Sequence, residues 1–192
     1  GHGVPGAFMS IIGNILLNEI VKNQRVYAPD EILSRLDKGV IEALHQKDED
    51  QSQEDGMDIT LCCIDRKKKL LQVACANHTA ILINGGKEHI IEGDIHSIGG
   101  LQFVKKQKKF HLHRFSLESD SILYMYSDGY QDQFDGKGFN KFKAKRFREL
   151  LTGNSTLPFN SQYDILKTTF LQWKGSYKQI DDVLVMGVKV SV

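Results

Sequence analysis

The sequence predicts an α+β domain in which β-sheets are sandwiched between helical layers. Three observations predict it. Two segments with helical spacing of apolar residues open the chain, short apolar and β-branched runs follow from residue 58, and helical spacing returns before a final apolar run. With 192 residues, 41% hydrophobic content and 26% charged residues, the chain has the size of one globular domain, which we expect to cover residues 1–192.

Two helices are expected at the start of the chain. The first covers residues 5–21, with a proline in its first turn, where the missing N–H costs little. We expect its apolar stripe to be buried: Phe8, Ile11, Ile12, Ile15, Leu16 and Ile20. The second helix begins near Pro29 and Asp30, and its stripe continues to Leu44. The polar stretch 46–55 is expected to be an exposed loop.

Strands are expected from Asp58 onward. The runs 59–64, 70–76 and 80–83 are separated by turn residues and predict an antiparallel meander. Residues 84–87 (NGGK) predict a hairpin turn, because glycine supplies the positive φ that such turns need. The remaining expected elements are strands over 89–91, 111–117 and 122–126, helices over 142–151 and 163–173, and a closing strand over 183–190.

The charge balance argues against two classes of partner. The chain has 25 lysines and arginines against 24 acids, a net charge of +1, so no overall field attracts nucleic acid or a membrane. Basic residues cluster at Lys105, Lys106, Lys108 and Lys109 and again over 137–148, which we interpret as solvated faces. No segment has the length and composition of a membrane span or a leader, so we expect a cytoplasmic location for this segment. Membrane tethering of the full-length protein through upstream regions stays open.

The cysteines do not indicate a reactive or metal-binding site. Cys62, Cys63 and Cys75 lie in predicted strands and lack the CxxC spacing of zinc and redox sites. We expect them to be reduced and buried, with raised pKa values, which makes a cysteine nucleophile improbable.

Acidic residues follow or precede two predicted strands. Asp128 comes directly after the strand 122–126, and the pair Asp181 and Asp182 precedes the last strand. Carboxylates fixed at strand ends suit hard cations such as Mg²⁺ or Mn²⁺. Spacing alone favours the alternative that these are ordinary turn residues, because Asp-Gly and Asp-Asp are common in turns.

Four segments, in their order and spacing, closely resemble the stage II sporulation E branch of the type 2C metal-dependent phosphatases. They are residues 1–10 (GHGVPGAFMS), 55–59 (DGMDI), 127–134 (SDGYQDQF) and 181–185 (DDVLV). The resemblance covers essentially the whole chain and overrides the turn interpretation of Asp128 and Asp181. It implies a four-layer α-β-β-α sandwich, here without its first strands. It also implies that the first two helices form a regulatory element that couples an input to the metal site.

The resemblance implies a metal-dependent phosphoserine and phosphothreonine phosphatase with two Mg²⁺ or Mn²⁺ ions. Asp128 and Asp181 correspond to metal ligands of the family, and Asp182 is a less direct candidate. Paired cations activate a water for in-line attack on phosphorus. Imidazole titrates near neutral pH, and His2 is expected next to the metal site. His2 is therefore either a proton donor for the departing oxygen or a histidine hydrogen-bonded to backbone at the helix entry. Asp58 either contacts metal or only starts a strand, and His78 is interpreted as an exposed turn residue.

One departure from the family concerns the region before the glycine-rich motif. The family places an aspartate there that bridges both metals, and this sequence lacks it together with the strands before it. We therefore expect this fragment to have impaired activity and an open sheet edge that favours self-association.

Relatives in this branch carry upstream sensor regions and act on phosphorylated regulatory proteins, notably antagonists of anti-sigma factors. We expect the same kinds of partner here, without nucleic acid or membrane contact by this fragment. Two alternatives stay open. The first is a catalytically degenerate module that binds a phosphoprotein, and the second is another two-metal hydrolase, such as a nuclease, whose basic groove with interleaved aromatics is not evident.

Overall fold

The computed structural model describes residues 3–44, 56–100 and 108–190. The chain divides into two compact units, which we describe separately. The N-terminal unit comprises Gly1–Thr79 and Ile91–Leu117, and the C-terminal unit comprises Ala80–Ile90 and Glu118–Val192. The predicted single domain over 1–192 stays a prediction.

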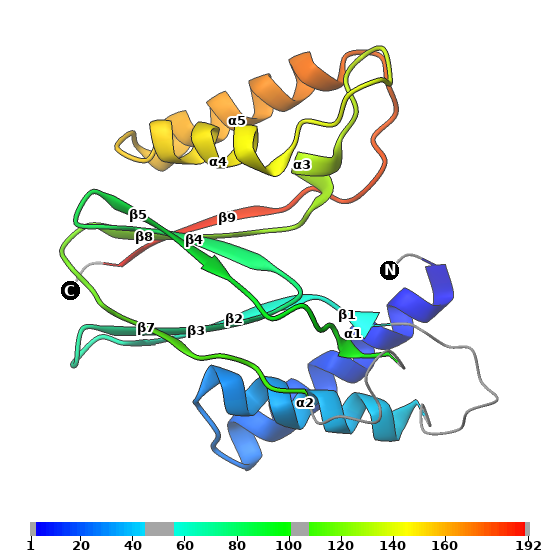
Figure 1. Ribbon diagram of the computed structural model, residues 1–192, viewed down its shortest axis with the longest axis vertical. Coiled ribbons are helices and arrows are strands. Elements are labelled where there is room, and N and C mark those ends of the chain that lie inside the picture. The colour runs from blue at the N-terminus through cyan, green and yellow to red at the C-terminus, as the bar shows by residue number, and fades with distance from the viewer. Residues whose placement is uncertain (1–2, 45–55, 101–107, 191–192) are drawn as a thin grey trace. The chain divides into compact units, whose positions relative to one another are not determined.

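The N-terminal unit packs helices against a small antiparallel sheet (Figure 1). Its helices are α1 (Gly3–Asn18), the π-helical turn η1 (Glu19–Asn23) and α2 (Pro29–Ala43). Its main sheet has the order β2 (Ile59–Asp65), β3 (Leu70–Ala76), β7 (His113–Ser116), and β1 (Gly56–Met57) pairs with β6 (Ile98–Gly99). The apolar face of α2 is buried through Leu33, Leu36 and Val40, which are 0% exposed, and it packs against β3 and β6. Burial of this face explains why residues 29–43 are held as a helix.

The outward face of α1 departs from the sequence prediction. Ile20 is buried, in η1, and Ile12 and Leu16 are half-buried, as expected. Phe8, Ile11 and Ile15 were predicted to be buried, yet they are 58%, 56% and 61% exposed. The prediction was wrong for these three because α1 carries apolar residues around most of its circumference. Helical spacing alone cannot select the side that faces the core.

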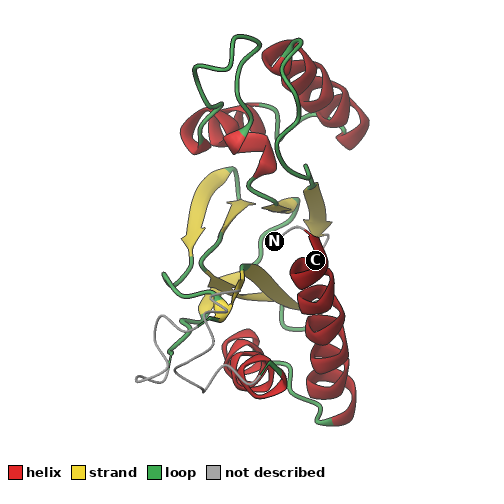
Figure 2. Ribbon diagram, turned by 90° about the vertical axis from the view of Figure 1, so that its right-hand side faces the viewer, coloured by secondary structure: helices red, strands yellow, loops and turns green. Residues whose placement is uncertain are grey.

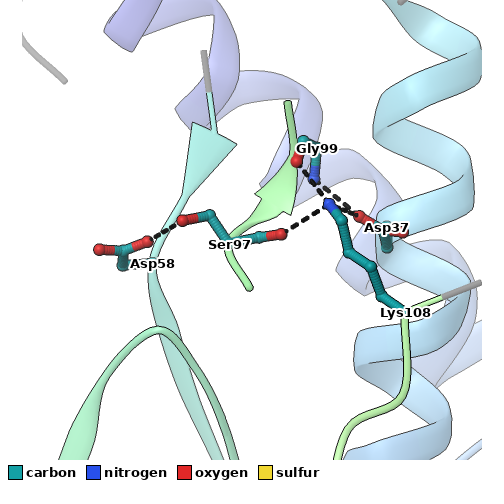
Figure 3. A network of polar contacts seen from close by, with 5 residues as sticks. All are labelled: Asp37, Asp58, Ser97, Gly99 and Lys108. Carbon is teal, nitrogen blue, oxygen red and sulfur yellow. Dashed lines mark hydrogen bonds and ion pairs between the residues drawn. The ribbon is translucent and has the colours of Figure 1, made fainter. Parts of the chain in front are cut away.

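A buried lysine ties α2 to the segment around β6 (Figure 3). The Lys108 Nζ lies 2.9 Å from Asp37 Oδ1 and donates to the carbonyl oxygens of Ser97 (2.8 Å) and Gly99 (2.6 Å). The Gly99 N–H also donates to Asp37 Oδ1, at 2.8 Å. The side chains of Lys108 and Asp37 are only 4% and 10% exposed, so each charge depends on the other. The interpretation of Lys108 as part of a solvated face was therefore wrong.

The C-terminal unit packs three helices on a four-stranded antiparallel sheet (Figures 1 and 2). Its elements are β4 (Thr79–Asn84), β5 (Lys87–Glu92), β8 (Ser121–Tyr126), β9 (Val185–Val190), α3 (Gly129–Asp132), α4 (Ala144–Gly153) and α5 (Phe159–Lys174), with strand order β5-β4-β8-β9. Tyr130 of α3 is 2% exposed and stacks on Phe147 of α4, with ring centroids 4.6 Å apart. Its ring also contacts Phe170 of α5, so one aromatic cluster joins the three helices.

Most predicted elements are present close to their expected bounds, but the predicted meander is wrong. Strand β3 pairs with β2 and β7, whereas β4 pairs with β5 and β8 in another sheet. The turn between β4 and β5 has the expected form, since Gly85 and Gly86 have φ of 55° and 73°. The short elements β1, β6 and α3 were not predicted, because two to four residues carry no measurable periodicity.

The cysteines are free thiols with different degrees of burial. Cys75 is buried as predicted, and burial raises the pKa of its thiol to about 11. Cys62 and Cys63 are only half-buried, so the prediction of burial was wrong for them, although burial still raises the pKa of Cys62.

Some predicted features cannot be compared with the structure. The loop expected over 46–55 and the lysines at 105 and 106 lie outside the described residues. Within the described ranges, no helix has the length and apolar character needed to cross a bilayer.

We predict that replacing Lys108 by Met destabilises the protein by about 3–5 kcal/mol, because the Asp37 carboxylate stays buried without its cation. Arg35→Met is the control: it breaks an exposed ion pair with Glu31 and an exposed hydrogen bond to Gln24, and it should cost less than about 1 kcal/mol. Urea unfolding of both variants measures the difference. Equal small losses for the two variants would show that the buried pair is not needed for folding.

Candidate metal centre

Asp128 stands where β8 ends and α3 begins. Its side chain is exposed, and its backbone carbonyl accepts a hydrogen bond from the Asp132 N–H at 3.0 Å, which starts the helix. Because β8 is paired on both sides, by β4 and β9, the position of Asp128 is fixed by a central strand of the sheet. The sheet therefore fixes the backbone that carries the Asp128 carboxylate.

Ser127 fastens the end of β8 to the segment before β9. Its N–H donates to the Leu184 carbonyl at 3.0 Å, and its hydroxyl accepts from the Leu184 N–H at 2.9 Å. The same hydroxyl donates to the Asp182 carbonyl at 2.8 Å. These three bonds place residues 127–129 directly beside 181–184. The structure therefore brings together the two acidic segments that the sequence singled out, although they are more than fifty positions apart.

Gly129 allows the two segments to approach this closely. A Cβ atom at this position would lie 2.3 Å from the Asp182 carbonyl oxygen and 2.9 Å from its carbonyl carbon. Both atoms belong to the backbone, so neither can rotate away. Glycine is required here by space and not by its φ angle.

Gln133 holds the segment that leads to Asp181, a role that sequence reasoning missed. It is completely buried. Its Nε2 donates to the Lys178 carbonyl at 3.0 Å, and its Oε1 lies 3.4 Å from the Ile180 nitrogen, which donates to it. Gln179 adds a bond from its Nε2 to the Asp181 carbonyl, at 2.8 Å. The only available signal was that Gln133 lies within the 127–134 motif.

The donor set of this edge suits a hard divalent cation. Asp128, Asp181 and Asp182 are all exposed, and within the described ranges none of them forms an ion pair. One oxygen of Asp181 accepts the Asp182 N–H at 2.7 Å, which leaves the other free to bind. Carboxylate oxygens unpaired with lysine or arginine are the ligands that Mg²⁺ and Mn²⁺ prefer. No group of three or more histidine, cysteine or acidic side chains able to hold a metal is found among the described residues.

The remaining candidate residues are His2, Asp58 and His78. His2 is outside the described residues. Asp58 belongs to the N-terminal unit, where its two oxygens accept hydrogen bonds from Asn77 Nδ2, at 3.0 Å, and from the Ser97 hydroxyl (Figure 3). Asp58 directly precedes β2, and its alternative role as a metal contact stays a prediction. His78 is half-buried, with Nδ1 3.2 Å from the Thr60 hydroxyl, so its interpretation as an exposed turn residue was wrong.

A family model described as stage II sporulation protein E matches residues 1–191. The chain belongs to this family. No curated protein sequence matches the chain. The family assignment therefore rests on the family model, and the fold can be compared with solved structures.

The family fold is seen in solved structures of low sequence identity. The SiaA-PP2C domain of Pseudomonas aeruginosa is 23% identical, with a TM-score of 0.85, over 100% of this chain and 72% of that one. The PP2C phosphatase domain of SpoIIE from Bacillus subtilis, solved with a fragment of its regulatory domain, is 16% identical, with a TM-score of 0.69, over 99% and 52%. The RsbU and RsbW domains of Rv1364c from Mycobacterium tuberculosis are 18% identical, with a TM-score of 0.70, over 97% and 48%. The chain thus spans about half the length of the last two, and its α+β fold is that of type 2C phosphatase domains.

We predict that Gly129→Ala destabilises the protein by about 1–3 kcal/mol, because the new methyl group would have to displace the Asp182 backbone. Gly153→Ala is the matched control, since no atom lies within 4 Å of the added Cβ at that helix end. It should be neutral or stabilising by up to about 1 kcal/mol. Thermal unfolding compares the two, and a Gly129 variant as stable as the Gly153 variant would contradict the close approach.

Proposed function

We propose that this chain is the catalytic region of a metal-dependent serine/threonine phosphoprotein phosphatase that acts on a phosphorylated regulatory protein in bacterial signalling. The observation that supports the proposal is the bonding of Ser127 to Asp182 and Leu184, which brings the backbones of two distant segments with exposed acidic residues together. Membership of the stage II sporulation protein E family supports the same activity.

The related structures support a metal cofactor and a regulatory partner. The phosphatase domain of SpoIIE from Bacillus subtilis was presoaked with manganese, and RsbX was solved in complex with magnesium. The Mycobacterium tuberculosis protein carries RsbU and RsbW domains in one chain. We propose, by analogy, Mg²⁺ or Mn²⁺ as cofactor, a regulatory phosphoprotein such as an anti-sigma factor antagonist as substrate, and an upstream sensor region as a further partner.

Asp128 and Asp181 are the proposed ligands, with Asp182 as a further one. When bound, the cations would supply an activated water and neutralise charge on the phosphoryl oxygens. Ser127 and Gln133 act as positioning residues, because they fix the backbone that carries the aspartates. His2 is proposed as the proton donor to the departing serine or threonine oxygen.

A degenerate phosphoprotein-binding module is the second candidate function. It is favoured by the absence of a group of three potential metal ligands from the described part of the chain. The two candidates differ in turnover and not in affinity for a phosphopeptide. A binding module should retain a phosphoserine peptide without releasing phosphate, whatever metal is added.

We predict that Asp128→Asn and Asp181→Asn each abolish Mn²⁺-dependent phosphate release from a phosphoserine peptide by the full-length protein. Thermal stability without metal should stay the same or rise slightly, because neutralising one of several neighbouring carboxylates reduces repulsion. Asp164→Asn, an exposed acid on α5, is the control and should keep full activity. Full activity of an Asp128 or Asp181 variant, or full activity in excess chelator, would refute the metal centre.

For the chain as it stands, we predict weak binding of Mn²⁺, at most one ion, and very low phosphatase activity. Two or three carboxylates without a bridging ligand cannot offset the repulsion between two cations a few ångströms apart. Isothermal titration with Mn²⁺, together with a phosphopeptide assay, measures both quantities. Tight binding of two ions with rapid turnover would contradict this prediction.

A further inference from the structure

Helices α4 and α5 border an open groove on the C-terminal unit, with a volume of about 600 Å³. On one side it is lined by Phe142, Arg146, Glu149, Leu150 and Asn154, and on the other by Thr169, Gln172 and Trp173. On each helix the lining residues recur three or four positions apart, so they form one continuous helix face. The aspartates of the candidate metal centre do not line this groove.

Trp173 is fixed in the groove by contacts on three sides. Its Nε1 donates to the Gln133 carbonyl at 3.0 Å, and the Phe142 ring meets it edge to face, with centroids 5.4 Å apart. The Arg146 guanidinium carbon lies 4.5 Å from the indole centroid, which is cation–π distance. The guanidinium is therefore held in place by an aromatic ring, and within the described ranges it forms no ion pair with a carboxylate.

The segment that leads into α4 is strongly basic. Residues 137–148 contain no acid and six cations: Lys137, Lys141, Lys143, Lys145, Arg146 and Arg148. Lys141 lies 3.1 Å from Asp132 and Arg148 lies 3.5 Å from Glu88. The other four form no ion pair with the residues that the structure describes. The groove's own lining contains one cation, Arg146, and one acid, Glu149. The excess positive charge is on the segment that leads into α4 and on the first turns of α4, in a chain whose net charge is only +1.

We propose that the α4–α5 groove docks an acidic segment of a partner protein, with one aliphatic or aromatic side chain next to an Asp or Glu. The apolar side chain would contact Leu150 and the Trp173 ring, and Arg146 would bind the neighbouring carboxylate through its paired N–H donors. Single-stranded nucleic acid fits less well, because it needs several open aromatic faces and Arg146 already covers one face of the indole. The inference goes beyond the proposed phosphatase activity and does not depend on it.

Trp173 is the single tryptophan of the chain, so its emission reports on the groove directly. The probes are seven-residue peptides of Glu and Asp with Leu, Ile, Met or Phe at the central position. Each peptide is prepared both unlabelled and labelled with fluorescein. The unlabelled peptides should change the Trp173 emission, and the labelled ones give the affinity by anisotropy. Peptides in which Lys replaces every acid, or Ser replaces the central residue, should bind at least about tenfold more weakly.

Arg146→Gln tests the proposed contact. The substitution should lower the affinity for the tightest-binding acidic peptide by about tenfold or more, because it removes a charge-assisted hydrogen bond. Lys167→Gln is the matched control: it removes an equal charge and a cation–π contact with Tyr163 on α5, but outside the groove. Thermal unfolding checks that both variants fold. The proposal is overturned if no acidic peptide changes the emission, if the two variants bind alike, or if single-stranded RNA or phosphatidylserine vesicles bind more tightly than the peptides at 150 mM salt.

Discussion

The close contact between the end of β8 and the segment before β9 is the constraint on which the candidate site depends. Antiparallel pairing continues from Tyr126 and Val185 into the bonds of Ser127, so the sheet itself sets the register of both acidic segments. Gly129 then turns the chain into α3 against the Asp182 backbone. The carboxylates are exposed, but the backbone that carries them is held on both sides. The two acidic segments are therefore held in a defined backbone arrangement, which is what a site built on rigid elements requires.

In the N-terminal unit, a buried ion pair holds distant segments together. Lys108 joins a helix, through Asp37, to the carbonyls of Ser97 and Gly99 (Figure 3). The hydroxyl of Ser97 in turn bonds to Asp58. A cation buried among three oxygen atoms is stable only while these partners stay in place, so a displacement of α2 would leave buried charges without partners.

Features that depend on the spacing of neighbouring residues or on short motifs could be predicted from the sequence. Apolar runs located β3 and β8, and motif order located Asp128 and Asp181. Burial of Lys108 could not be predicted, because a lysine among lysines normally marks a solvated surface. The assignment of β3 and β4 to different sheets depends on long-range pairing that spacing does not encode. Gln133 was missed because its role lies in bonds to residues more than forty positions away.

Gly129 also has a consequence for how sequences of this kind can diverge. At Gly86 the φ is +73° and no atom lies near an added Cβ, so asparagine, which tolerates that conformation, is an acceptable replacement. At Gly129 the obstacle is a neighbouring carbonyl group, and every side chain larger than hydrogen meets it. Substitutions can therefore accumulate at Gly86, whereas at Gly129 they cannot. A distant relative with another residue at the position of Gly129 must have separated the two acidic segments, whatever else of the fold it retains.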